Sequence, residues 1–154
     1  MITAEDGAFL RCAIAIAAAA ITSGDAPYGS LLVDAQGTVL MQAHNTVDRD
    51  CDITAHPELK LARWAARELS PETAAATTMY TSCQPCGMCT GAIVRSGLGR
   101  VVYALSTEQV VELNPGSDRP AVRQDGPALF DEARAPIERY YQTGGDHRAP
   151  TDAE

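Results

Sequence analysis

The chain has 154 residues and a hydrophobic fraction of 45%, which predicts a folded domain and excludes a wholly disordered protein. Its formal net charge of −8 argues against broad, sequence-independent binding to nucleic acid, because such binding needs Lys and Arg to neutralise phosphates. No apolar run is long enough to cross a membrane and the first residues do not resemble a signal peptide, so we expect a cytoplasmic protein.

Apolar residues at helical spacing predict a first helix over residues 4–22; they are Phe9, Leu10, Ala13, Ile14, Ala17 and Ile21. Two strands follow, at 30–33 and 38–43, joined by a hairpin turn at 34–37. The later elements are expected in this order: a helix over 57–69, a strand over 77–81, a helix over 85–97, a strand over 100–104, a helix over 107–113, a short strand at 121–124 and a helix over 127–141.

The alternation of later strands with helices implies parallel crossovers, whereas the first two strands form an antiparallel hairpin. The predicted fold class is therefore α/β, a three-layer α/β/α arrangement with a mixed five-stranded central sheet. We expect one domain over residues 1–143 and a disordered tail over 144–154.

The five cysteines include three within seven residues, Cys83, Cys86 and Cys89. An odd number with this clustering is a poor disulfide framework, and it favours metal binding in a reducing compartment. Cys12 lies within the apolar pattern of the first helix, so we expect it to be a core residue.

Cys86 and Cys89 are expected in the first turn of the helix that Pro85 opens, on one face, where both sulfurs can reach one ion. The positive end of the helix dipole favours the thiolate form that zinc binds. His56, at the start of the preceding helix, is the best third ligand. Two thiolates and one imidazole leave a fourth position open, which is typical of a catalytic zinc site.

Glu58 lies two residues after His56, where its carboxylate can hydrogen-bond to a water in the open position. Zinc lowers the pKa of such a water towards about 7. The pattern His-x-Glu, followed later by Pro-Cys-x-x-Cys, is the signature of zinc-dependent deaminases.

Two other metal sites are compatible with these cysteines. The run Cys83, Cys86 and Cys89 resembles part of an iron–sulfur site, but no later cysteine completes it. A structural zinc site with Cys51 or Cys83 as fourth ligand is also open, and the position of Glu58 weighs against it.

The two motifs resemble those of the cytidine deaminase-like superfamily, and the resemblance extends from about residue 6 to 141. Residues 26–30 look like the Pro-Phe-Gly-Ala segment before the first strand of that family. Residues 52–56 are similar to the Asp-Pro-Thr-Ala-His segment of guanine and tRNA adenosine deaminases, and residues 81–93 to guanine and fungal cytosine deaminases. The resemblance implies a Zn2+ cofactor, a five-stranded sheet between helices, and a homodimer or larger oligomer.

The resemblance also implies a mechanism and further site residues. Water activated by zinc attacks the amino-bearing carbon of a nucleobase ring, while Glu58 carries protons from the water to a ring nitrogen. Asn45 would orient the ring and Tyr28 would line the pocket. Two structural alternatives are open, because Asn45 could be a turn residue and Tyr28 could simply pack.

The chain departs from the family pattern at two positions. Pro57 stands where the family usually has alanine or glycine, and proline lacks the N–H that relatives use to bind a substrate carbonyl or ring nitrogen. Gln84 replaces the glutamate of guanine deaminases, next to the ligands, where we expect it to affect the site. Both changes concern substrate binding, so we include Pro57 among the substrate-binding residues.

The leading hypothesis is a zinc-dependent deaminase of a free nucleobase or close analogue, with a guanine-like purine slightly favoured. A small substrate is preferred over nucleic acid because the chain is acidic and lacks a basic tail. The alternatives are a tRNA adenosine deaminase, a cytosine or nucleoside deaminase, and a non-catalytic zinc-stabilised binding protein. Non-catalytic relatives lack the glutamate, which weighs against the last of these.

Overall fold

In the computed structural model, which describes residues 2–117 and 121–143, the chain divides into two units, Met1–Asp118 and Arg119–Glu154. The first unit contains, in chain order, α1 (Ala4–Thr22), β1 (Gly29–Val33), β2 (Val39–His44), α2 (Val47–Asp50), α3 (Pro57–Glu68), α4 (Pro71–Ala76), β3 (Thr78–Cys83), α5 (Gly87–Ser96), β4 (Arg100–Leu105), α6 (Thr107–Leu113) and the 3-10 helix η1 (Pro115–Ser117). The second unit contains α7 (Phe130–Gln142).

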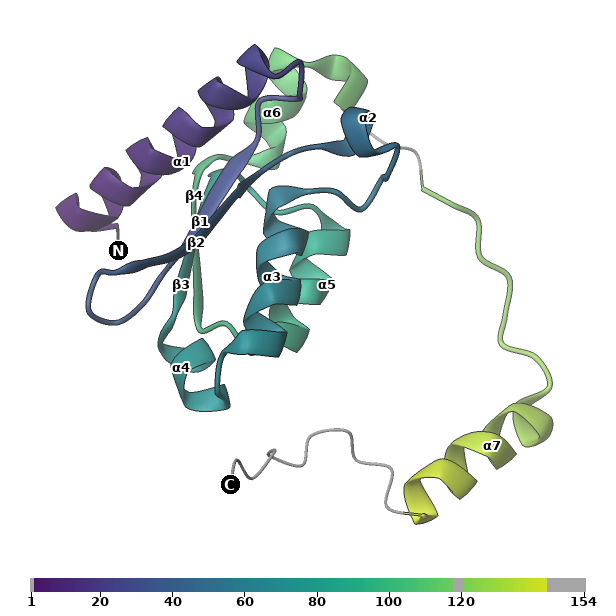
Figure 1. The fold of residues 1–154 in the computed structure, drawn as a ribbon. Coiled ribbons are helices and arrows are strands. Elements are labelled where there is room, and N and C mark those ends of the chain that lie inside the picture. The colour runs from purple at the N-terminus through teal and green to yellow at the C-terminus, as the bar shows by residue number, and fades with distance from the viewer. Residues whose placement is uncertain (1, 118–120, 144–154) are drawn as a thin grey trace. The chain divides into compact units, whose positions relative to one another are not determined.

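The strands form one mixed sheet in the order β2-β1-β3-β4. β1 pairs antiparallel with β2 and with β3, and β3 pairs parallel with β4. Figure 1 shows α1 on one face of this sheet, with α3 and α5 together on the other. The predicted three-layer α/β/α arrangement and the mixed sheet are therefore confirmed.

Alternate residues of the strands contribute to two hydrophobic cores, one on each face of the sheet, because successive side chains of a strand point to opposite faces. Leu31 and Val33 pack with Ala13 of α1 on one face. Leu32 packs with residues of α3 and α5 on the other face, including Leu61 and Ile93. β1 is buried at all five positions, so it forms the centre of the first unit.

The helix α1 has the predicted bounds, but the face that it buries differs from the prediction. Its buried apolar residues are Ala13, Ala17 and Ala20, whereas Ile14, Ile21 and Cys12 are exposed, so the prediction of Cys12 as a core residue is wrong. The helix lies so close to β1 that a Cβ on Gly29 would be 2.5 Å from the backbone nitrogen of Ala17. Small side chains fit this narrow gap, and Ile14 and Ile21 are left exposed.

The described residues form four strands, so the prediction of a five-stranded sheet is wrong for this part of the chain. Residues 121–124, predicted as the fifth strand, have no regular secondary structure and are exposed. Val122 is the one strongly apolar side chain of that segment, so a strand there could bury little surface. The single domain over 1–143 stays a prediction, and the predicted tail over 144–154 lies outside the described residues.

The structure adds two short helices, α2 and α4, in segments without a predicted element. Ser70 caps α4 by accepting a hydrogen bond from the Thr73 N–H at 3.2 Å, and Pro71 occupies its first turn. The helix α5 begins at Gly87, after Pro85, because Cys86 takes the N-cap position. None of the helices in the described ranges is long and apolar enough to cross a membrane.

Candidate metal centre and active site

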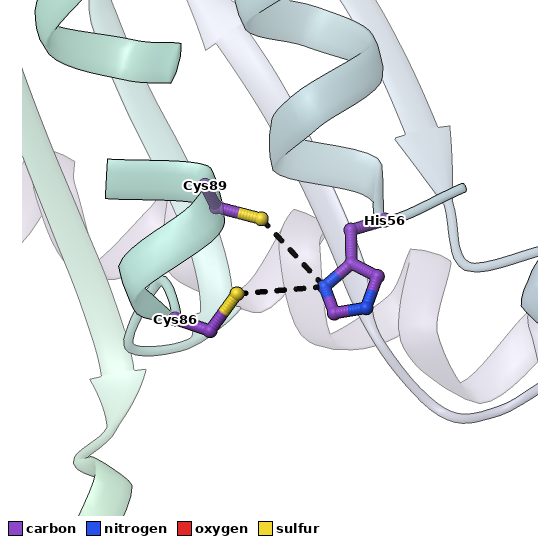
Figure 2. Close-up of side chains that lie close together, drawn as sticks. All are labelled: His56, Cys86 and Cys89. Atoms are coloured by element: carbon purple, nitrogen blue, oxygen red, sulfur yellow. Dashed lines mark hydrogen bonds between the residues drawn. The ribbon is translucent and has the colours of Figure 1, made fainter. Parts of the chain in front are cut away.

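Three side chains from two helix N-termini converge at one point. His56 is the N-cap residue of α3, Cys86 is the N-cap residue of α5, and Cys89 lies in the first turn of α5. Figure 2 shows the imidazole Nδ1 of His56 facing both sulfurs, 3.8 Å from Cys86 Sγ and 3.6 Å from Cys89 Sγ. The ligand atoms all lie within 4.8 Å of one another, so the predicted ligand set comes together.

The spacing of these atoms fits a tetrahedral zinc site. Zn–S and Zn–N bonds of about 2.3 and 2.0–2.1 Å place an Sγ and a ligand nitrogen about 3.6 Å apart around one ion. The two sulfur–nitrogen distances in this cluster agree with that value. Two thiolates and one imidazole are a common donor set for zinc, and three protein ligands leave a fourth position for water or substrate.

Proton sharing within the cluster gives its three groups different pKa values. Hydrogen bonds with Cys89, which has the larger effect, and with His56 lower the pKa of the Cys86 thiol to about 3. The same sulfur–sulfur contact, and then burial, raises the pKa of the Cys89 thiol. The hydrogen bond with Cys86 raises the pKa of His56, although burial opposes it. A divalent cation would replace these shared protons, because zinc binds thiolates and neutral imidazole.

Glu58 lies beside this cluster, in the first turn of α3, and is 5% exposed. Its Oε2 is 3.7 Å from Cys89 Sγ. Its Oε1 accepts a hydrogen bond from the Thr81 hydroxyl at 2.7 Å and a longer one from the Ser30 hydroxyl at 3.4 Å. A buried carboxylate is thus held next to the candidate metal ligands, which is the position that the sequence predicts for it.

Pro57 is buried between the two functional candidates that flank it in sequence. It is the first residue of α3 and is less than 2% exposed. Proline is well suited to this position, because the N–H that it lacks would have no partner within the helix. The substrate-binding role of Pro57 stays a prediction.

Tyr28 and Asn45 lie in loops that are joined by a backbone hydrogen bond, from the Asn45 N–H to the Tyr28 carbonyl at 3.0 Å. Burial, and then electrostatic interaction with Cys83 and Glu58, raise the pKa of the Tyr28 hydroxyl. Asn45 is buried, and its Oδ1 accepts the Val47 N–H at 3.0 Å. Asn45 therefore has the turn role, and binding of substrate by either residue stays a prediction.

Gln84 forms a link between two loops of the sheet edge. Its side-chain oxygen accepts the Thr107 N–H at 3.0 Å, and its own N–H donates to the Leu105 carbonyl at 2.8 Å. These two bonds join the β3–α5 loop, which leads to Cys86, to the start of α6. The predicted effect of Gln84 on the site stays a prediction.

The sequence pattern does not reveal Lys60, Thr81 and Ser30 as neighbours of the site. Lys60, the single lysine of the chain, donates to the His44 carbonyl at 3.0 Å and to the Thr46 hydroxyl. It thereby ties α3 to the two residues that flank Asn45, and burial lowers the pKa of its amine. The one sequence feature that could have pointed to Lys60 is that the single lysine of the chain lies two residues after Glu58.

Comparisons with known proteins agree with this geometry. Residues 3–105 match the family of the cytidine and deoxycytidylate deaminase zinc-binding region. A probable cytosine deaminase of Schizosaccharomyces pombe is 36% identical over 138 residues, covering 87% of this chain and 82% of that protein. A tRNA-specific adenosine deaminase of Aquifex aeolicus is 32% identical over 96 residues, covering 62% of this chain and 63% of that protein.

Guanine deaminase of Bacillus subtilis is similar along nearly the whole chain. It is 30% identical over 146 residues, covering 94% of this chain and 90% of that protein. The X-ray structure of a guanine deaminase from the same species superimposes with a TM-score of 0.72 at 25% identity, covering 96% of this chain and 97% of that one. The match spans the ligand cluster, Glu58 and the sheet that carries them, and this chain belongs to the cytidine and deoxycytidylate deaminase family of zinc-binding, hydrolytic deaminases.

Proposed function

We propose that this protein deaminates a free nucleobase, with a guanine-like purine as its leading substrate, and that Glu58 moves the protons. The observation that carries the proposal is the position of the Glu58 carboxylate, whose Oε2 lies 3.7 Å from a candidate zinc ligand. A proton-transferring group must lie within reach of the water that it activates. The Glu58 carboxylate, which lies beside one ligand atom, would be near a water in the fourth position of the cluster.

The residues have distinct roles in this reaction. His56, Cys86 and Cys89 hold zinc, which when bound supplies Lewis-acid activation of water. Glu58 accepts a proton from the attacking water and delivers it to a ring nitrogen. Glu58 then carries the second proton of the water from the new hydroxyl group to the amino group. The carbon–nitrogen bond breaks, ammonia leaves, the ring nitrogen keeps its added proton, and the electron pair left on the oxygen of the water forms a carbonyl on the base. Asn45 orients the ring and Tyr28 lines the pocket.

The choice of a free base rests on how much of the chain each relative covers. The similarity to guanine deaminase extends over 94% of this chain, whereas that to the tRNA-specific enzyme covers 62%. The net charge of −8 also disfavours RNA, because phosphates must be neutralised by basic residues. Cytosine is the second candidate, since the probable cytosine deaminase has the higher identity of 36%.

A homodimer in solution is part of the proposal and is tested by sedimentation.

Ammonia release from zinc-loaded protein tests the proposal. The substrates are guanine, cytosine, adenine, the matching nucleosides and a tRNA anticodon stem with its loop. We expect guanine to react fastest. Glu58→Gln should lower kcat by roughly 10²–10⁴-fold, the usual contribution of a general base, while keeping its zinc. Glu68→Gln, on the exposed end of the same helix, is the matched control and should retain activity.

Two results would contradict the proposal. If the wild type and Glu58→Gln released ammonia at the same rate, Glu58 would not be the proton carrier. If the tRNA stem reacted and the free bases did not, the assignment to a small substrate would be wrong.

A further inference from the structure

A buried chain of two hydroxyl groups ends at the carboxylate of Glu58. The Ser30 hydroxyl donates to Thr81 Oγ1 at 2.8 Å, and the Thr81 hydroxyl donates to Glu58 Oε1 at 2.7 Å. Ser30 and Thr81 are direct partners in the register of β1 and β3, so their side chains lie on the same face of the sheet. Both are 0% exposed, and no water competes for these bonds.

The protons of this chain are fully accounted for. A hydroxyl has one proton to donate and lone pairs that accept. Thr81 gives its proton to Glu58 and accepts the proton of Ser30, so each donor has one short bond. The direct contact from the Ser30 hydroxyl to Glu58 Oε1 is 3.4 Å, too long to be the principal bond. Ser30 therefore acts on Glu58 mainly through Thr81.

The two oxygens of Glu58 have different surroundings. Oε1 points to the sheet and accepts the hydroxyl of Thr81. Oε2 lies beside Cys89 Sγ, at 3.7 Å, and so faces the metal cluster. A carboxylate held at one oxygen cannot rotate without breaking that bond, and hydrogen bonds to an ionised group are stronger than those between neutral groups.

We propose that Thr81 and, through it, Ser30 are positioning residues that anchor Oε1 of Glu58, so that Oε2 is the oxygen that exchanges the proton with water and base. This inference rests on the proposed function of Glu58. It assigns the two carboxylate oxygens different tasks, and it identifies two residues on the sheet that neither touch substrate nor bind metal. The hydroxyl chain links the central strands directly to the chemistry.

Thr81→Val tests the anchor, because valine has nearly the same shape as threonine and removes only the hydroxyl. We expect kcat to fall roughly 10-fold, part of the roughly 10²–10⁴-fold contribution of a general base, with KM and zinc content unchanged. Thr81→Ser restores a hydroxyl and should recover most of kcat. Ser30→Ala should have a smaller effect, and the Ser30→Ala/Thr81→Val double variant should be no slower than Thr81→Val alone.

Thr78→Val is the matched control. Thr78 is the first residue of the same strand, three residues before Thr81, and its side chain lies on the opposite face of the sheet, the face that α1 covers. We expect its kcat and KM to equal those of the wild type. A Thr81→Val protein with wild-type kcat, or with a raised KM and unchanged kcat, would overturn the inference, and so would a double variant whose losses multiply.

Unfolding in urea tests the anchor independently of any substrate, and it distinguishes a failure of this inference from a failure of the proposed function. With Glu58 present, Thr81→Val removes the short hydrogen bond to a buried carboxylate oxygen, leaves only the 3.4 Å contact from Ser30, and should lower the urea midpoint. In a Glu58→Ala background the hydroxyl has lost its acceptor, so Thr81→Val should leave the midpoint unchanged or raise it. Equal shifts in the two backgrounds would overturn the inference even if guanine were deaminated. Unequal shifts without ammonia release from any base would uphold the anchor and refute the proposed activity.

Discussion

Pro57 separates the ligand candidate His56 from the proposed proton carrier Glu58, and it lacks the backbone N–H that another residue would have at this position. The position is the first of a helix, where proline costs nothing in hydrogen bonds within α3. The missing N–H therefore has no structural penalty, but a base edge that needs a donor there would bind without a partner. Unpaired polar groups in a pocket are costly, so we predict that Pro57 affects which base is accepted rather than whether water is activated.

At this scale we predict that Pro57→Ala changes the preference between bases. Restoring the N–H should change the ratio of kcat/KM for guanine and cytosine by roughly 10-fold, the size expected for one hydrogen bond in a pocket. Steady-state kinetics on both bases measures the ratio. The control is Pro71→Ala, which makes the same substitution at the first residue of α4. An unchanged ratio in Pro57→Ala with normal zinc content would show that the missing donor does not determine specificity.

Asp6 joins three elements of the first unit. It is 2% exposed. Its carboxylate accepts hydrogen bonds from both Nη atoms of Arg100 in β4, at 2.7 and 2.9 Å. It also accepts the hydroxyl of Tyr80 in β3 at 2.8 Å and the N–H of Thr3 at 2.7 Å. The start of α1 is thus held to β3 and β4, and burial together with the bond to Asp6 raises the pKa of Tyr80 to about 12.

The element-scale prediction concerns the pH dependence of stability. The hydrogen bonds from Arg100, then Thr3 and Tyr80, hold the pKa of Asp6 well below its ordinary value of 3.8. The unfolded chain therefore binds a proton more readily than the folded chain as the pH falls. The stability that Asp6 contributes is fully present above about pH 4 and is lost as the pH falls below that value.

Urea unfolding of wild type and Asp6→Asn between pH 7 and pH 3 measures this contribution. The wild type should have the higher midpoint at pH 7, and the difference should begin to shrink below about pH 4. Asp48→Asn, at an exposed carboxylate, should have little effect at any pH. A difference between wild type and Asp6→Asn that stays constant down to pH 3 would contradict the ion pair with Arg100.

Metal binding connects the local site to the stability of the whole molecule. The ligands come from the N-termini of α3 and α5, two helices that pack against each other and against the sheet. A ligand that binds the folded state alone stabilises it by about 2.7 kcal/mol at 100 times its Kd. Zinc bound by His56, Cys86 and Cys89 should therefore stabilise this helical layer.

We predict that chelation of zinc lowers Tm by roughly 5–10 °C. This is the change in Tm expected when a chain of this size loses about 2.7 kcal/mol of stabilisation. Thermal unfolding with parallel measurement of zinc content tests this. Cys86→Ser should lose zinc and show the lower Tm without chelator, whereas Cys12→Ser and Cys51→Ser, at exposed cysteines, should keep both zinc and Tm. Loss of zinc without any change in Tm would show that the metal does not stabilise the fold.

The sequence by itself determined the ligand set, the neighbouring carboxylate and most of the elements. Two short motifs contain these residues, His56 with Glu58 and Cys86 with Cys89. Each motif stands at the start of a helix that the sequence also predicts. Turn residues and helix caps are local signals of the same kind, which is why α1 and α6 have their predicted bounds. Such information needs no knowledge of how distant segments pack.

Only the tertiary structure decided which distant residues surround those motifs. Thr81 and Ser30 reach Glu58 across 23 and 28 residues of sequence, because strand register places them opposite each other beneath α3. The narrow gap between α1 and β1 decided that Ala13 and Ala17, and not Ile14, are buried. The predicted strand at 121–124 was wrong for the same reason, because a strand depends on a pairing partner and on buried surface, and neither is written in a local pattern of residues.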